Sequence, residues 1–139
     1  MIKMFRKTVA YLIILLLVPS IFTMAYALSD DEPSWWNSGW RYRQEIYAPI
    51  STDGSFAIYQ PIDIRIEFDY SCWAKNENRS SVRVCCWHDE EWYELESQVY
   101  DFNFKDDSHA SSCSLVFLVP DIANGHERYF VYYSDHENA

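Results

Sequence analysis

Turn-forming and helix-breaking residues are scarce in this 139-residue chain, which has only 3 Gly and 5 Pro. Disordered and low-complexity segments are typically rich in such residues and poor in aromatic ones. Aromatic residues instead make up 18% of this chain, so there is ample apolar surface to bury. The composition therefore predicts a folded protein, and the length allows one hydrophobic core but not two.

Basic residues are also few, with 11 Lys and Arg against 21 Asp and Glu. Three of the 11, Lys3, Arg6 and Lys7, lie at the N-terminus, so the rest of the chain has 8 basic against 21 acidic residues, a net charge of −13. Nucleic acids and anionic membrane surfaces are bound by patches of Lys and Arg. The charge balance argues against a nucleic acid as partner and leaves a membrane contact only through an uncleaved N-terminal segment.

Signatures of catalysis and of metal binding are missing from the sequence. It has no G-x-S-x-G motif, no P-loop and no Cys/His catalytic pattern. The cysteines form no C-x-x-C, and the charged segments 88–91 and 106–109 lack the ligand spacing of EF-hand or zinc sites. We therefore expect no metal and no cofactor. Glu94, Glu96 and Asp101 lie close together in the sequence, which leaves a glycoside-active enzyme with paired carboxylates as an alternative function.

Residues 1–27 are typical of a secretory signal peptide or a signal-anchor. The basic N-terminus precedes an apolar run from Val9 to Val18, and Ala25-Tyr26-Ala27 is the small-x-small pattern that signal peptidase cleaves. The apolar stretch 8–28 is also long enough to cross a bilayer as an uncleaved helix. Both alternatives place the rest of the chain outside the cytoplasm, secreted or at the cell surface. Residues 28–34 then form an acidic linker.

Four cysteines lie in the part predicted to be exported, where disulfides persist. They are Cys72, Cys85, Cys86 and Cys113. A bridge between the neighbours Cys85 and Cys86 would strain the backbone. Cys86 and Cys113 share the inward parity of their predicted strands, so we predict a disulfide between them, with Cys85 pointing the other way. Buried free thiols are the alternative for at least one pair.

Period-two alternation of apolar and polar residues runs through residues 35–135 and predicts strands almost everywhere. The predicted strands are 40–50, 56–68, 82–86, 92–102, 113–119 and 128–133. Pro61 is expected to divide the second of these or to place it at an edge. No helical periodicity appears in this region. We predict an all-β domain over residues 35–135, an antiparallel β-sandwich (jelly-roll-like) of six or seven strands, followed by a tail of residues 136–139.

Aromatic motifs mark the beginning, middle and end of this domain. They are Trp36-Asn37-Ser38-Gly39-Trp40-Arg41-Tyr42-Arg43, Trp92–Tyr100, Leu115–Pro120 and Tyr129–Tyr133. Together they resemble a domain-of-unknown-function family of archaeal and bacterial secreted or cell-surface proteins, which opens with a W-x-N-x-x-W-x-Y-R-like motif. The resemblance implies a β-sandwich, frequently joined to lectin-like or repeat modules, and brings no catalytic residues. A stand-alone member and the front part of a longer surface protein both fit it.

Six tryptophans make carbohydrate a candidate ligand, because a flat indole ring can stack on the apolar face of a sugar. Trp87 shares the parity of Arg83 and is predicted to face outward, and Trp92 and Trp73 are the other candidates. The alternative is that these rings fill the core. Asn78 begins an N-x-S sequon and is a candidate for glycosylation.

The function predicted from these features is a non-catalytic extracellular or cell-surface module that binds a carbohydrate or another cell-surface protein. The alternatives are the glycoside-active enzyme and a purely structural spacer in the cell envelope.

Overall fold

The structure, a computed structural model, describes residues 32–138, and its compact domain begins at Pro33. The predicted signal segment 1–27 and most of the predicted linker lie outside the described residues. The elements are β1 (Tyr42–Ile46), the short 3-10 helix η2 (Ser55–Ala57), β2 (Pro61–Asn76), β3 (Arg79–Ser80), β4 (Val82–His88), β5 (Glu91–Leu95), β6 (Ser97–Asp106), β7 (His109–Leu118) and β8 (Arg128–Tyr133). Within this part of the chain, no helix has the length and apolarity needed to cross a bilayer.

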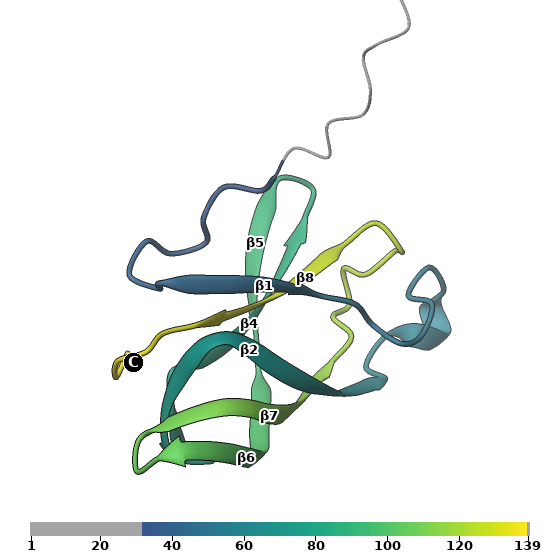
Figure 1. The fold of residues 1–139 in the computed structure, drawn as a ribbon. Helices are drawn as coiled ribbons and strands as arrows, with labels where there is room; N and C mark the ends of the chain where they lie inside the picture. Colours follow the sequence, from purple (N-terminus) through teal and green to yellow (C-terminus); the bar gives the residue numbers. More distant parts are fainter. Residues whose placement is uncertain (1–31, 139) are drawn as a thin grey trace, which may run out of the picture. The chain divides into compact units, whose positions relative to one another are not determined.

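The strands form two antiparallel sheets of four strands each (Figure 1). The first sheet has the order β1-β8-β4-β5 and the second the order β3-β2-β7-β6. The all-β prediction is confirmed, with eight strands in place of six or seven. The predicted strand 92–102 is in fact two strands, because the chain leaves the first sheet after Leu95 and enters the second at Ser97. The short β3 was not expected.

The segment before Pro61 is not a strand, although its apolar residues alternate. It contains η2, and Tyr59 has a left-handed φ of 63° that no regular strand adopts. Phe56, which the alternation placed inside, is 93% exposed. Pro61 itself begins β2, a position that a residue without a backbone N–H tolerates.

A bulge in β2 brings the second sheet to the edge of the first. The register with β7 shifts between Glu67 and Cys72, and a bulge bends its strand. Tyr70, in the bulged part, stacks on Tyr42 of β1 with ring centroids 4.5 Å apart. The Gln44 side-chain amide of β1 donates to the Glu67 carbonyl at 2.9 Å. These contacts join the bulged part of β2 to the edge strand β1.

The main core is a cluster of buried apolar side chains that draws on both sheets. Ile62 of β2 and Leu115 of β7 meet Val84 of β4 and Val131 of β8 in this cluster, all at most 1% exposed. Cys86 belongs to it as well, so the inward parity predicted for Val84, Cys86 and Leu115 is confirmed. Burial of this surface is the main stabilising contribution to the domain.

A second apolar cluster lies on the opposite face of the first sheet. Its buried members are Trp40, Cys85, Phe130 and Tyr132, with Trp36, Trp87 and Trp92 packed against them. Successive residues of a strand point to opposite faces, which places Cys85 away from its neighbour Cys86, as predicted. The first sheet is therefore buried on both faces.

The chain that precedes β1 covers this second cluster. Its backbone N–H at Trp36 donates to the Tyr132 hydroxyl at 3.0 Å. Its Ser34 carbonyl accepts from the Trp92 indole N–H at 3.0 Å, and Pro33 is buried. Pro33 and Ser34, predicted to belong to a linker, are thus part of the domain.

The charged segment 88–91 forms a tight hairpin between β4 and β5. Asp89 and Glu90 have φ values of 49° and 63°, as a two-residue hairpin turn of type I′ requires. The left-handed region is costly for Glu but not for Gly. We expect Glu90→Gly to raise the free energy of unfolding by about 0.5 kcal/mol in urea titrations of the full chain. Glu77→Gly is the control, because Glu77 lies in the β2–β3 turn and has no positive φ; this change should lower the free energy of unfolding. An equal change in the free energy of unfolding of both variants would contradict this expectation.

Candidate functional site

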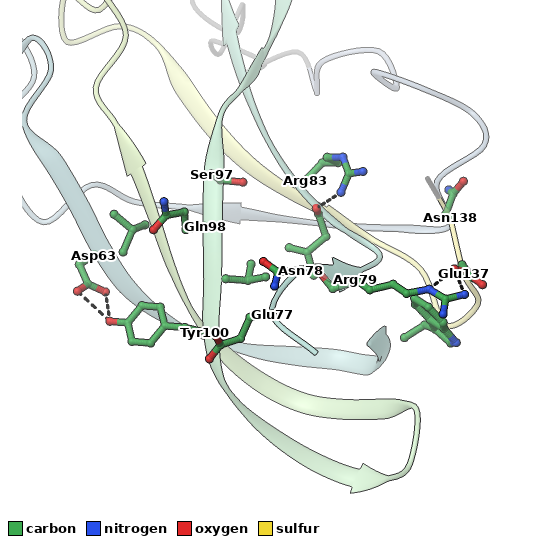
Figure 2. A pocket seen from close by; sticks show the side chains of 15 residues that line it. Asp63, Glu77, Asn78, Arg79, Arg83, Ser97, Gln98, Tyr100, Glu137 and Asn138 are labelled. Atoms are coloured by element: carbon green, nitrogen blue, oxygen red, sulfur yellow. Dashed lines mark hydrogen bonds and ion pairs between the residues drawn. The ribbon is translucent and has the colours of Figure 1, made fainter. Parts of the chain in front are cut away.

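A polar cleft of about 880 Å³ lies beside β3, β4 and β6 and the residues that follow β8. Residues from β2 and the β2–β3 turn line it as well. Its lining includes Asp63, Trp73, Asn78, Arg79, Gln98, Tyr100 and Glu137. Figure 2 shows Asp63 and Tyr100 toward one side of the cleft and Arg79, Glu137 and Asn138 toward the other.

The β2–β3 turn presents Glu77 and Asn78 at the rim of the cleft. The Asn76 side-chain oxygen accepts from the Asn78 backbone N–H at 3.0 Å, a local bond for which Asn is favoured in turns. Asn78, the sequon residue, is exposed. The turn thus places one acidic and one amide side chain at the cleft.

Arg79 joins Trp73 to the C-terminal residues. Its guanidinium lies 5.6 Å from the centroid of the Trp73 ring and donates from Nε to Glu137 at 2.8 Å. Trp73 is partly buried. The arginine therefore covers one face of the indole and holds it in place.

The other side of the cleft is a tyrosine–carboxylate pair across the second sheet. The Tyr100 hydroxyl of β6 donates to both Asp63 oxygens of β2, at 2.8 and 2.9 Å. This hydrogen bond to the carboxylate raises the pKa of Tyr100. Gln98, two residues earlier on β6, also lines the cleft. The two sides together offer donors and acceptors next to one aromatic ring, an arrangement suited to a polyhydroxylated ligand.

The structure brings two of the three predicted tryptophans together and places the third elsewhere. Trp87 and Trp92 are in contact, with centroids 5.0 Å apart and planes tilted by 54°, on the outer face of the first sheet. They do not form one flat platform, and Trp92 also packs edge-on against Phe130 at 5.3 Å. Trp87 does lie on the outer face, but it is partly buried there. Trp73 alone lies in the polar cleft.

The carboxylates considered for glycoside hydrolysis are divided between the sheets. Glu94 lies on β5, 3.4 Å from Arg83. Asp101 lies at an irregularity of β6, 3.0 Å from Arg65. The sequence placed both on one strand, and the change of sheet around Glu96 separates them. Each carboxylate is instead held by an arginine.

The predicted Cys86–Cys113 disulfide is not present, because all four cysteines are buried free thiols. Cys86 lies on β4 of the first sheet, and Cys113 lies on β7 of the second, where it pairs with Ile66. The alternation of side chains predicted that both cysteines point inward, but it does not determine where along its strand each one lies. Burial raises the pKa of Cys86 and of Cys113 to about 12, which makes both thiols poor nucleophiles.

We expect the native chain, purified without reductant, to leave its cysteines unlabelled by a thiol reagent near pH 8 and to react at all four after unfolding in urea. The physical reason is that burial hinders both ionisation of the thiol and access of the reagent. Fewer than four reactive thiols after unfolding, restored by prior reduction, would show a disulfide and contradict this expectation.

Histidine and acidic side chains do not gather into a metal site in the described residues. Across residues 32–138, no group of three or more His, Cys, Asp or Glu could hold a metal ion. His88 is buried, and its Nε2 lies 3.2 Å from the neighbouring Asp89 carboxylate. Its contact is thus with the adjacent residue of the β4–β5 turn.

No family model, curated protein or solved structure matches this chain. The family resemblance therefore stays a prediction that rests on the aromatic motifs. In the structure, the first motif makes a turn in which the Asn37 side chain accepts from the Gly39 N–H at 2.8 Å. The Asn37 carbonyl accepts from the Trp40 N–H at 3.1 Å. This turn carries Trp36 and Trp40 onto the outer face of the first sheet, which gives the motif a structural role.

Proposed function

We propose that this domain is a non-catalytic extracellular binding module that holds a carbohydrate in the cleft beside Trp73. We further propose that its two sheets form a β-sandwich, which their shared core supports. The extracellular location rests on the predicted export signal in residues 1–27.

The observation that carries the proposal is the combination of one aromatic ring with polar side chains in the cleft. Trp73 offers apolar surface for the face of a sugar ring. Asn78 and Gln98 can each donate to and accept from hydroxyl groups. The cleft volume of about 880 Å³ falls within the range typical of small-ligand sites. A carbohydrate is a class of ligand that uses both kinds of surface.

The non-catalytic part of the proposal rests on the placement of the acidic side chains. Hydrolysis of a glycoside needs two carboxyl groups facing the scissile bond. Glu94 and Asp101 lie in different sheets, and each is paired with an arginine. In the cleft, Asp63 accepts a hydrogen bond from the Tyr100 hydroxyl, and Glu137 accepts one from the Arg79 guanidinium.

The proposal is tested by a glycan array followed by calorimetry with the full chain. We expect Trp73→Ala to weaken binding of the captured glycan by about tenfold, the effect of losing one stacking ring. Trp87→Ala is the matched control and should bind normally, because Trp87 lies on the outer face of the other sheet. Binding that is lost in Trp87→Ala but kept in Trp73→Ala would contradict the cleft assignment. Turnover of a glycan that is lost in Glu94→Gln would indicate the enzyme instead.

A further inference from the structure

His109 lies between two groups that can only accept hydrogen bonds. Its Nδ1 is 2.9 Å from a carboxylate oxygen of Asp106, and its Nε2 is 3.0 Å from the backbone carbonyl of Asp135. A neutral imidazole has one N–H and can satisfy only one such partner. The ring that satisfies both is the imidazolium cation, which carries a hydrogen on each nitrogen.

Residues 134–138, here the C-terminal segment, are held on the domain by this ring and by Ser81. The backbone N–H groups of Ser134 and Asn138 donate to the Ser81 carbonyl and hydroxyl, at 3.3 and 2.7 Å. The Trp73 N–H donates to the Ser134 carbonyl at 2.8 Å. Residues 136–138, predicted to be a tail, are therefore docked beside β3, through Arg79 and Ser81.

We propose that His109 is a pH-dependent clamp that holds the C-terminal segment beside the cleft and loosens it as the pH rises. Loss of one ring proton leaves a single N–H for two acceptors, and the charged Asp106 carboxylate holds that hydrogen on Nδ1 more strongly than the neutral Asp135 carbonyl holds it on Nε2. Only Nε2 joins the β6–β7 hairpin to the C-terminal segment, because Asp106 belongs to the same hairpin as His109. Loss of the hydrogen from Nε2 therefore breaks this link.

The charges around the ring favour its cationic form. The surrounding groups are Asp106 and Asp107 of the β6–β7 hairpin, Lys75 of β2, Arg41 before β1, and Asp135 and His136 of the C-terminal segment. The Lys75 ammonium lies 3.5 Å from the Asp107 carbonyl, and Arg41 is paired with the Asp135 carboxylate at 2.9 Å. Both positive charges are thus bound to other partners.

These contacts also fix the direction of the pH dependence. The hydrogen bond to Asp106, followed by that to the Asp135 carbonyl, raises the pKa of His109 above its usual value of 6.5, and burial opposes them only in part. A group with a raised pKa in the folded state stabilises that state fully below its unfolded pKa. The contribution is lost as the pH rises through the folded pKa. The clamp is therefore closed in mildly acidic solution and opens toward alkaline pH.

Release of the segment would change the cleft as well. Glu137 lines the cleft and holds Arg79, which in turn covers Trp73. Opening of the clamp would free Arg79 and expose more of the indole ring. Only this consequence for ligand binding rests on the proposed function; the clamp itself does not.

The clamp is tested without any ligand, by NMR amide hydrogen exchange of the full chain from about pH 6 to about pH 9, corrected for the intrinsic exchange rate. We expect protection of the Ser134 and Asn138 amides to fall by about tenfold across this range, the effect of losing one charge-assisted hydrogen bond. The midpoint should coincide with the titration of the His109 ring in the same sample. Protection of the Val84 amide in β4 should stay unchanged.

Two variants separate the clamp from general effects of pH. His109→Gln keeps a side-chain donor but cannot titrate, so protection of the segment should become independent of pH. His136→Gln removes the neighbouring histidine and should keep the wild-type profile. A wild-type profile without pH dependence, a midpoint that follows a different histidine, or an unchanged profile in His109→Gln would each overturn the proposal. Because no glycan is present, these outcomes do not bear on the proposed function, which the glycan-binding experiment tests separately.

Discussion

Replacement of Phe130 with alanine is expected to lower the free energy of unfolding by about 3–5 kcal/mol. Phe130 is 1% exposed on the outer face of the first sheet. Its ring meets Trp92 at 5.3 Å and lies beside the guanidinium groups of Arg43 and Arg128, at 5.2 and 5.1 Å. Truncation removes this buried surface and leaves a cavity beneath Trp92 that the rigid sheet cannot close.

Urea unfolding of the full chain, followed by tryptophan fluorescence, measures the effect. Phe56→Ala is the matched control, because it makes the same chemical change at a side chain that is 93% exposed. The control should change the free energy of unfolding by less than about 0.5 kcal/mol. Similar losses in both variants would mean that the outer aromatic cluster does not act as a second core.

Replacement of Glu127 with alanine is expected to cost about 3 kcal/mol, because it leaves backbone donors without an acceptor. Glu127 is 9% exposed. One of its oxygens accepts from the Asn124 and Gly125 N–H groups, at 2.9 and 2.8 Å. The other accepts from the Tyr129 hydroxyl at 3.0 Å. The carboxylate thereby fixes the turn that leads into β8.

The turn also depends on glycine at position 125. Gly125 has a φ of +88°, and a Cβ added there would lie 2.8 Å from the Cβ of Asp53. Its conformation and its close approach to Asp53 therefore both favour glycine.

The pH dependence of this effect has a definite sign. Burial opposes ionisation of Glu127, but the hydrogen bonds from Thr52, the Asn124 amide and Tyr129 outweigh it and lower the pKa of the carboxyl below 4.5. A lowered pKa stabilises the folded state above the unfolded pKa, and this contribution is lost as the pH falls through the folded value. The free energy of unfolding of Glu127→Ala should therefore fall furthest below that of the wild type at neutral pH, and this difference should shrink below about pH 4.5. Glu67→Gln, at an exposed side chain, is the control, and a difference that stays constant down to pH 3 would contradict the charged role of Glu127.

The abundance of tryptophan has two separate explanations in this domain. Trp36, Trp40, Trp87 and Trp92 close the outer face of the first sheet. Trp73 is on the other sheet, at the cleft. Trp73 therefore replaces Trp87 as the residue that we propose stacks on a sugar ring.

The sequence by itself determined where most of the strands lie and which faces their side chains occupy. The predicted strand 128–133 coincides with β8, and Cys85 and Cys86 lie on opposite faces as their adjacency requires. Alternation is a local property of an extended chain, so it can be read from neighbouring residues. The same pattern wrongly predicted that Phe56 lies inside on a strand. The backbone at Tyr59 is left-handed, and the alternation of apolar and polar residues does not reveal this.

Only the tertiary structure decided which strands share a sheet and which residues, distant in the sequence, lie next to each other. It separated Glu94 from Asp101, because the chain changes sheets between β5 and β6. It also separated Cys86 from Cys113, because the alternation of side chains does not determine where along its strand a residue lies. It joined Arg79 to Glu137, 58 residues later, and His109 to the Asp135 carbonyl. Such contacts depend on the pairing of distant strands and on the bulge in β2, and no local pattern in the sequence encodes either.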